Sequence, residues 1–230
     1  MVKIQIIEKL FLHIVYFSYL ILPLTFLFSK NRKKGFIPIT IALYGIVFFL
    51  LLQLYQYLPR TTKTIYQSFY TYFEYFVFAF FFWSNIKSKK LKKFILISSV
   101  LFFVFQLVYI FTTEVNRLDS IPISIETILL FVYIFFFFYE FSKSLNGSYI
   151  YNHYCFWISV GILIYLGGSF FFYILIDHLN REQITTFGNM TFVAEILKNF
   201  LFGFSLIIYS KNPTNNNNIK HSNVPYLDMI

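Results

Sequence analysis

Seven stretches of the chain are apolar over about 20 residues, and short polar segments separate them. These stretches are residues 5–28, 36–57, 66–86, 94–111, 121–141, 154–176 and 188–210. A helix needs about 20 mainly apolar residues to cross a bilayer, because lipid offers no hydrogen-bond partner to a free backbone group. The third stretch is the least apolar, since Glu74 interrupts it, but the charges of its flanking loops require a crossing there. We therefore predict an all-α polytopic membrane protein, a bundle of seven transmembrane helices.

The composition supports this fold class and excludes others. Of the 230 residues, 58% are hydrophobic and only 13% are charged, whereas a soluble domain carries roughly a quarter charged residues. The single cysteine, Cys155, excludes an internal disulfide framework. The net charge of +9 lies in loops beside the apolar stretches, where anionic lipid headgroups are the nearest partners. We therefore expect contacts with lipid and no binding of nucleic acid.

The loops alternate in charge, which predicts the orientation of the chain. Six basic residues lie on one side of the seven spans and twelve on the other. The twelve are Lys30, Arg32, Lys33, Lys34, Lys87, Lys89, Lys90, Lys92, Lys93, Lys143, Lys211 and Lys220. Because basic residues are enriched on the cytoplasmic side of membrane proteins, the amino terminus is expected outside and the carboxyl terminus inside.

The expected domain organisation is simple. Residues 1–211 form the seven-helix transmembrane domain, and residues 212–230, which include a run of four asparagines, form a disordered cytoplasmic tail. No loop exceeds about a dozen residues, so neither side is expected to carry a soluble domain. The activity is therefore expected within the membrane or through a partner protein.

Four ionisable residues interrupt the apolar stretches: Glu74, Glu126, Glu195 and Lys198. A charge in the bilayer core costs a few kcal/mol, so such side chains turn inward and find partners. We therefore expect these four to converge. Two other acids, Glu8 and Glu140, lie near the ends of their spans and are interpreted as solvated interfacial charges.

One lysine against three carboxylates leaves this cluster short of positive charge. Either a carboxylate holds a proton, or a cation or cationic ligand supplies the balance. We predict an acidic and aromatic cavity that opens toward the outer leaflet and binds a small molecule or lipid. The alternative is that these groups only hold helices together, by hydrogen bonds of about 1 kcal/mol each. The candidate ligand-binding residues are Tyr70, Glu74, Glu126, Tyr133, Glu195, Lys198 and Asn199.

Catalytic and metal-binding patterns are not apparent in the sequence. His13 has no acidic or histidine companion at metal-ligand spacing in its own span, and Ser98 and Ser159 have no histidine partner in view. We therefore predict no catalytic residue, no metal site and no cofactor, and we do not expect an enzyme.

Three segments carry a resemblance to a known group of proteins. Residues 126–133 (ETILLFVY), 156–165 (FWISVGILIY) and 195–202 (EILKNFLF) resemble a family of small, Phe- and Ile-rich seven-span proteins common in Bacteroidetes. The resemblance covers about two-thirds of the chain. It implies the same seven-span arrangement and a location in a bacterial inner membrane, and it implies no activity.

A second resemblance is to microbial rhodopsins, which share seven spans and an outside amino terminus. It would make Lys198 the retinal-linking lysine and Glu74 its counterion. The chain departs from that pattern because the third span lacks the expected Arg and the sixth lacks the Trp and Pro that pack against retinal. Retinal is therefore not an expected cofactor.

These patterns favour a membrane-embedded sensory or interaction module that binds a ligand or lipid. Two alternatives stay open. One is a proton- or cation-coupled small-molecule transporter, in which Glu74 exchanges a proton near the midplane; the other is a scaffold subunit that binds a membrane protein partner.

Overall fold

Seven long helices form the described part of the chain. The structure is a computed structural model that describes residues 2–29, 36–112, 120–144, 150–175 and 178–211. The long helices are α1 (Val2–Phe28), α2 (Phe36–Tyr57), α3 (Arg60–Asn85), α4 (Lys89–Thr112), α5 (Ser120–Ser144), α6 (Tyr154–Leu175) and α7 (Arg181–Lys211). A short 3₁₀ helix, η2 (Ile150–Asn152), precedes α6. The predicted tail after residue 211 lies outside the described residues.

The helices follow the predicted spans, with larger differences at two amino-terminal ends. α2 has the predicted bounds, whereas α3 begins at Arg60 and α7 at Arg181, six and seven residues earlier than predicted. At α7, Asn180 and Gln183 exchange hydrogen bonds, each side chain accepting from the other's backbone N–H at 2.9 and 3.0 Å. This capping box starts the helix in a polar segment that hydropathy does not detect.

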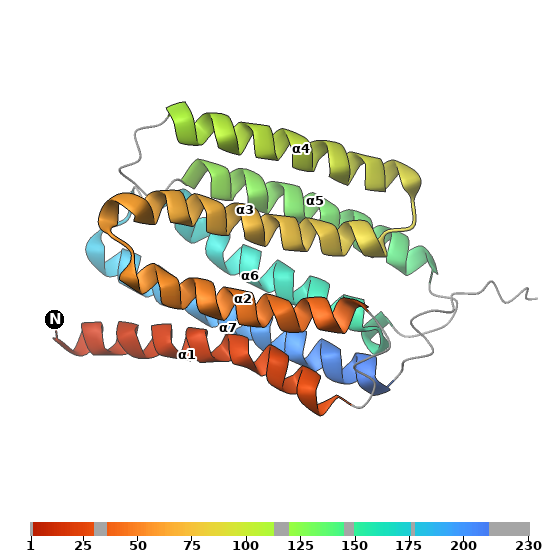
Figure 1. Cartoon of the computed structure of the whole chain (residues 1–230), viewed down its shortest axis with the longest axis horizontal. Helices are drawn as coiled ribbons and strands as arrows, with labels where there is room; N and C mark the ends of the chain where they lie inside the picture. The colour runs from red at the N-terminus through yellow and green to blue at the C-terminus, as the bar shows by residue number, and fades with distance from the viewer. Residues whose placement is uncertain (1, 30–35, 113–119, 145–149, 176–177, 212–230) are drawn as a thin grey trace, which may run out of the picture.

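Within the described residues, six of the seven long helices are long and apolar enough to cross a membrane. They are α1, α2, α4, α5, α6 and α7. α3 falls short because charged and polar side chains, including Lys63 and Glu74, interrupt it. α3 nevertheless lies among the other six in the bundle (Figure 1). The chain is therefore an all-helical, membrane-embedded protein.

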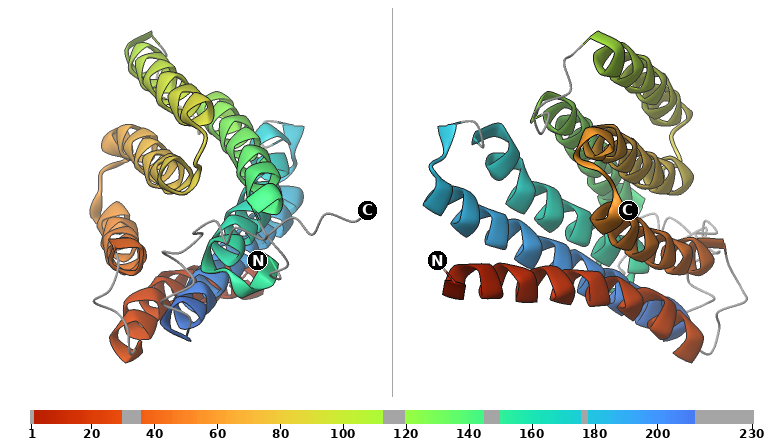
Figure 2. Two further views of the ribbon diagram at one scale, coloured as in Figure 1. Left: turned by 90° about the vertical axis from the view of Figure 1, so that its right-hand side faces the viewer. Right: turned by 60° about the vertical axis from the view of Figure 1, so that its left-hand side comes forward.

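The helices pack as two groups. In the first group α2 packs on α1, α1 on α7 and α7 on α6; in the second, α3 packs on α4 and α5. α5 joins the groups by packing on α6 (Figure 2). α2 and α3 make few contacts although they are consecutive in the chain. The polar site described below lies between α3 and the first group.

Glycines mark the closest helix contacts. The sequence pattern Gly161, Gly167 and Gly168 predicts a close contact on α6, and α6 indeed packs most closely against α7. A Cβ atom at Gly168 would lie 2.6 Å from the Cβ of Ala194, and one at Gly161 would lie 3.1 Å from the Phe202 ring. A Cβ at Gly167 would meet nothing within 4 Å. Two of the three glycines therefore serve the contact with α7.

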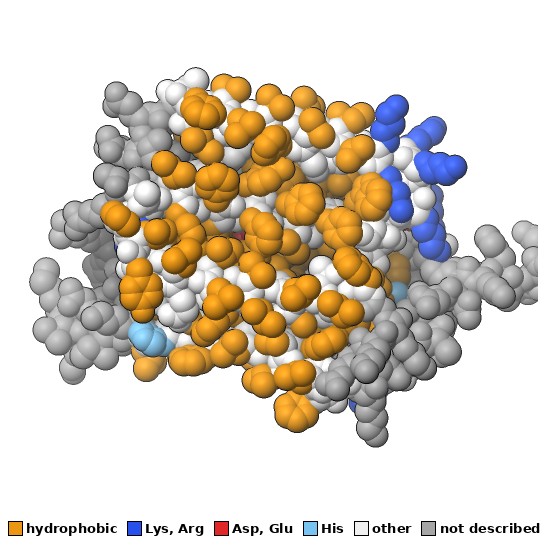
Figure 3. Space-filling model, viewed as in Figure 1, with side chains coloured by type: hydrophobic (Ala, Val, Ile, Leu, Met, Phe, Trp, Pro, Cys, Tyr) orange, Lys and Arg blue, Asp and Glu red, His pale blue; other side chains and the backbone are white. Residues whose placement is uncertain are grey.

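The surface has an apolar girdle and one basic end. Exposed Phe, Leu and Ile side chains cover the face shown in Figure 3, while lysines gather at one edge. The carboxyl-terminal ends of α1, α3, α5 and α7 lie at this same end of the bundle (Figure 1). The basic end so defined carries Lys87, Lys89, Lys90, Lys92, Lys93, Lys143 and Lys211. The remaining basic residues predicted for this side lie outside the described residues.

Candidate functional site

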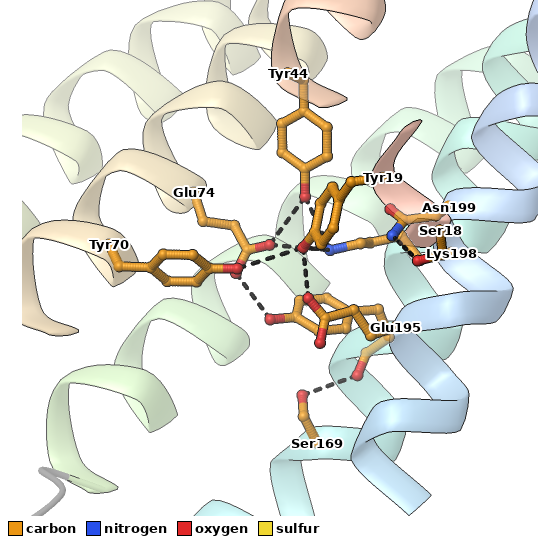
Figure 4. Close-up of polar contacts among 10 residues, drawn as sticks. Ser18, Tyr19, Tyr44, Tyr70, Glu74, Ser169, Glu195, Lys198 and Asn199 are labelled. Atoms are coloured by element: carbon orange, nitrogen blue, oxygen red, sulfur yellow. Dashed lines mark hydrogen bonds and ion pairs between the residues drawn. The ribbon is translucent and has the colours of Figure 1, made fainter. Parts of the chain in front are cut away.

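Polar side chains from five helices meet inside the bundle (Figure 4). We call them the polar centre and define it as Tyr19 of α1, Tyr44 of α2, Tyr70 and Glu74 of α3, Tyr165 of α6, and Glu195 and Lys198 of α7. These residues lie toward the middle of their helices, far from either end of the bundle. An interior charge there depends on protein partners, because water is distant.

Lys198 is the centre's only cationic residue, and its side chain is fully buried. Its ammonium lies 3.1 Å from Oε1 of Glu74. It also donates to the hydroxyl oxygens of Tyr44 at 2.8 Å and Tyr19 at 3.4 Å. These three bonds use all three ammonium protons. The amine therefore has an acceptor for each of its three protons.

Glu74 binds partners through both carboxylate oxygens. The Tyr44 hydroxyl donates to Oε1 at 3.0 Å, and the Tyr165 hydroxyl donates to Oε2 at 2.8 Å. Tyr44 therefore accepts from Lys198 and donates to Glu74, which closes a ring of three groups. Charge-assisted hydrogen bonds of this kind compensate in part for the lost hydration of the buried pair.

Tyr19 connects this ring to a second acid. Its hydroxyl donates to Oε1 of Glu195 at 2.5 Å and lies 3.3 Å from the Tyr70 hydroxyl. Glu195 is half-buried and lies one helical turn before Lys198. No ion pair joins it to Lys198 within the described residues, because the ammonium faces Glu74. The two acids thus share one cation, one directly and one through a phenol.

Aromatic rings enclose the ammonium. Its nitrogen lies 3.8 Å from the centroid of the Tyr165 ring and 5.7 Å from that of Phe78. The negative face of an aromatic ring attracts a cation, most strongly where water is excluded. The enclosure therefore favours positive charge at this place, whether on Lys198 or on a bound group.

A second polar layer lies beside the centre. Asn199 follows Lys198 on α7 and donates to the Ser18 hydroxyl of α1 at 2.8 Å. Its carbonyl oxygen is buried and has no hydrogen-bond partner within the described residues. Spacings of three and four residues place Glu195, Lys198 and Asn199 on one helical face, which turns inward as the sequence predicts.

The structure brings together four of the seven candidate residues: Tyr70, Glu74, Glu195 and Lys198. Asn199 is adjacent to them. Glu126 is buried on α5, where the charges of Glu74 and Lys198 act on it. Whether any of these residues binds a ligand stays a prediction.

Tyr133 lies apart from the centre, in a separate chain of hydroxyl groups between α3, α4 and α5. It lies 2.8 Å from the Tyr75 hydroxyl and 2.6 Å from that of Ser98, and Tyr75 lies 2.9 Å from Ser99. These contacts hold α4 against its neighbours. They do not reach the Lys198–Glu74 pair.

Sequence reasoning missed Tyr19, Tyr44 and Tyr165. The apolar stretches contain tyrosines both at their ends, where interfacial residues are common, and in their middles. A tyrosine at mid-span needs a hydrogen-bond partner in the interior, because lipid supplies none. That depth is the signal that could have identified all three.

An apolar groove borders the centre between α2 and α3. Tyr44, Phe78 and Phe202 line it at the centre, and Phe36, Ser84 and Asn85 line it toward the basic end. It encloses a cavity of about 60 Å³. The sequence instead predicts an acidic cavity that opens at the opposite end of the bundle, and that cavity stays a prediction.

The arrangement can hold, exchange or balance positive charge. In the described parts of the chain, no three His, Cys, Asp or Glu side chains are grouped so as to hold a metal ion. The two resemblances named above stay predictions. Comparison of the chain with protein-family models, curated proteins and solved structures finds no match, so the site has to be interpreted from its own geometry.

Proposed function

We propose that this chain is a seven-span sensory or binding module of a bacterial inner membrane, and that its polar centre responds to a cation. The observation that carries the proposal is the sharing of one buried ammonium, Lys198, between Glu74 and, through Tyr19, Glu195. The cation is a proton or the ammonium group of a small amphipathic molecule. The amino terminus is outside, and α3 is the seventh crossing.

The charge count gives the physical reason. With every group ionised, Glu74, Glu195 and Lys198 carry one net negative charge, and buried Glu126 adds another. In a medium of low dielectric constant such an imbalance is costly, so the centre favours uptake of a positive charge. The added positive charge is expected beside Glu195, because the Lys198 ammonium contacts Glu74 and reaches Glu195 only through Tyr19.

The position of Glu74 links uptake of a cation to the packing of α3. Glu74 belongs to α3, whereas the side chains bound to it, Tyr44, Tyr165 and Lys198, belong to α2, α6 and α7. α3 otherwise packs mainly on α4 and α5. A cation that weakens the Lys198–Glu74 pair therefore loosens α3 from the first helix group. Such a movement of one group against another is a common way to transmit binding.

The test uses the two tryptophans, Trp83 on α3 and Trp157 on α6, as probes in lipid nanodiscs. We expect their fluorescence to change between pH 8 and pH 5, and the midpoint to shift in Tyr19→Phe and Glu195→Gln. Tyr133→Phe is the matched control, because it removes a hydroxyl group of the separate hydroxyl chain. This variant is expected to have the same midpoint as the wild type. An unchanged midpoint in both centre variants would refute the proposal.

A proton- or cation-coupled transporter is the second candidate, because Glu74 lies between two helix groups. In a transporter, the polar centre would open first to one side of the membrane and then to the other. Transporter sites are usually built from broken helices, whereas α1 continues through Pro23 without interruption. Solute uptake into proteoliposomes that follows an imposed pH gradient and is lost in Glu74→Gln would favour transport over sensing.

A further inference from the structure

A second cavity, of about 420 Å³, lies at the basic end of the bundle. It is formed where the α3–α4 turn meets the end of α5 and the start of α6. Lys87, Lys92, Glu140 and His153 supply its charged and titratable side chains. It shares no residue with the polar centre, and its chemistry is different.

The cavity has unpaired positive charge. Its one carboxylate, Glu140, accepts hydrogen bonds from the backbone N–H groups of Lys87 and Ser88, so it stabilises the start of α4. Glu140 is half-buried and contacts the α3–α4 turn, and its interpretation as a solvated interfacial charge stays a prediction. Among the residues that the structure describes, neither Lys87 nor Lys92 has a carboxylate within 4 Å of its ammonium. The lining therefore favours an anion.

His153 adds an unsatisfied polar atom. Its ring packs between Phe141 and Tyr154, with centroid distances of 5.1 and 5.2 Å. Nδ1 is buried and has no hydrogen-bond partner in the described part of the chain. A buried polar atom without a partner costs about 1–3 kcal/mol. An anionic oxygen in the cavity would satisfy an N–H at this position.

The cavity continues into the apolar groove between α2 and α3. Ser84 and Asn85 line both spaces. From Asn85 to Phe78 the groove follows α3 for seven residues, about 10 Å of helix. Phe36, at its outer end, is 67% exposed, so the groove borders the surface that faces lipid. A cavity with two lysines thus adjoins an apolar groove.

We propose that the cavity and groove together bind one anionic phospholipid. Its phosphate lies near Lys87, Lys92 and His153, and the first part of one acyl chain lies in the groove between α2 and α3. A soluble anion would leave the groove empty. The bound lipid would fill the weak α2–α3 contact and thereby support the packing beside the polar centre.

The first test is native mass spectrometry of the protein in a nonionic detergent, with phosphatidylglycerol or phosphatidylcholine carrying the same chains. We expect the wild type to retain phosphatidylglycerol preferentially. Lys87→Ala/Lys92→Ala is expected to weaken this binding about thirtyfold, at roughly 1 kcal/mol for each lysine. The matched control, Lys89→Ala/Lys90→Ala, removes two exposed lysines that do not line the cavity and is expected to retain the lipid. Equal losses in the two double variants, or equal retention of the two lipids, would overturn the proposal.

The second test separates a lipid from a soluble phosphate ester. Long-chain phosphatidylglycerol is expected to raise the melting temperature of the protein, whereas glycerol phosphate at the same concentration is not. Val77→Phe, which fills the groove, is expected to reduce the effect of the lipid. If this variant does not fold, dihexanoyl phosphatidylglycerol gives the same information, since its chains are too short to occupy the groove fully. Equal stabilisation by glycerol phosphate would assign the cavity to a soluble anion and overturn the lipid proposal.

Discussion

At the residue scale, the buried charge of Lys198 depends on the acceptors that surround its ammonium. A lysine ammonium has three protons, and the structure supplies three acceptors, Tyr19, Tyr44 and Glu74. Removing one member of a buried ion pair leaves the other charge uncompensated, which costs more than removing both. The pair is therefore expected to be strongly coupled.

A double-mutant cycle measures that coupling. Lys198→Met alone is expected to destabilise the protein by about 3–5 kcal/mol, because it leaves Glu74 buried without its cation. Lys198→Met/Glu74→Gln is expected to recover a large part of this loss. Unfolding of the wild type, Lys198→Met, Glu74→Gln and the double variant in mixed detergent micelles gives the four free energies of the cycle. Additive effects of the two substitutions would contradict the ion pair as the dominant contact.

His153 gives the chain a pH dependence outside the membrane spans. Burial, together with the positive charge of Lys87, lowers the pKa of His153 below its usual value of 6.5. The other charged groups that line its cavity are Lys92 and Glu140. As the pH falls below about 6.5, the unfolded chain takes up a proton that the folded chain resists, so stability decreases.

The expected loss is below about 1 kcal/mol, because solvent screens a partly exposed ring. Thermal unfolding of the wild type and His153→Gln at pH 7.5 and 5.5 measures it, and the variant is expected to lose less stability on acidification. His13→Gln on α1 is the control. A wild-type curve that shifts no more than that of His153→Gln would contradict the assignment.

Sequence reasoning identified the charged members of the centre and missed its phenols. Glu74, Glu195 and Lys198 stand out because a charge in an apolar stretch is rare. Tyr19, Tyr44 and Tyr165 do not stand out, because tyrosine is common at membrane interfaces and only depth separates the two uses. The cavity at the basic end could not be predicted at all, since it depends on how the end of α5, with Glu140, meets the α3–α4 turn.

At the element scale, hydropathy predicts where the apolar part of each helix lies. It does not predict where a helix begins when its first turns are polar. α7 begins at Arg181 because of the exchange between Asn180 and Gln183, and that signal is local and polar. α3 is amphipathic, and its polar face is directed at the centre. Its low hydropathy therefore reflects this polar face.

Two neighbouring glycines of α6, Gly167 and Gly168, test the α6–α7 contact. Gly168→Leu is expected to force the helices apart, because even a Cβ atom would lie 2.6 Å from the Cβ of Ala194. Overpacking of this kind costs about 1–3 kcal/mol. Gly167→Leu, one residue earlier, has open space at its Cβ and is the control. The melting temperature in detergent is expected to fall for Gly168→Leu only, and equal effects would contradict the packing described.

At the scale of the whole molecule, one orientation in the membrane has to suit both the apolar girdle and the basic end. The apolar girdle of Figure 3 is bounded by lysines at one end. The bias of basic residues toward the cytoplasm predicts that this end is inside, as in the proposed orientation. The polar centre then lies at mid-depth, and the basic-end cavity lies at the level of the inner headgroups, where anionic phospholipids are concentrated.

The proposed orientation requires that α3 crosses the membrane, and two cysteine variants test this crossing. Thr62→Cys lies near the start of α3 and Lys90→Cys near the start of α4, both at exposed positions. We expect a membrane-impermeant maleimide to label Thr62→Cys on intact cells and Lys90→Cys only after the membrane is opened. The parent chain is the control, because its Cys155 is 3% exposed and is expected to stay unlabelled. Labelling of both sites from one side would show that α3 does not cross. The reverse pattern would place the basic end outside, and the anionic lipid site would then face the wrong leaflet.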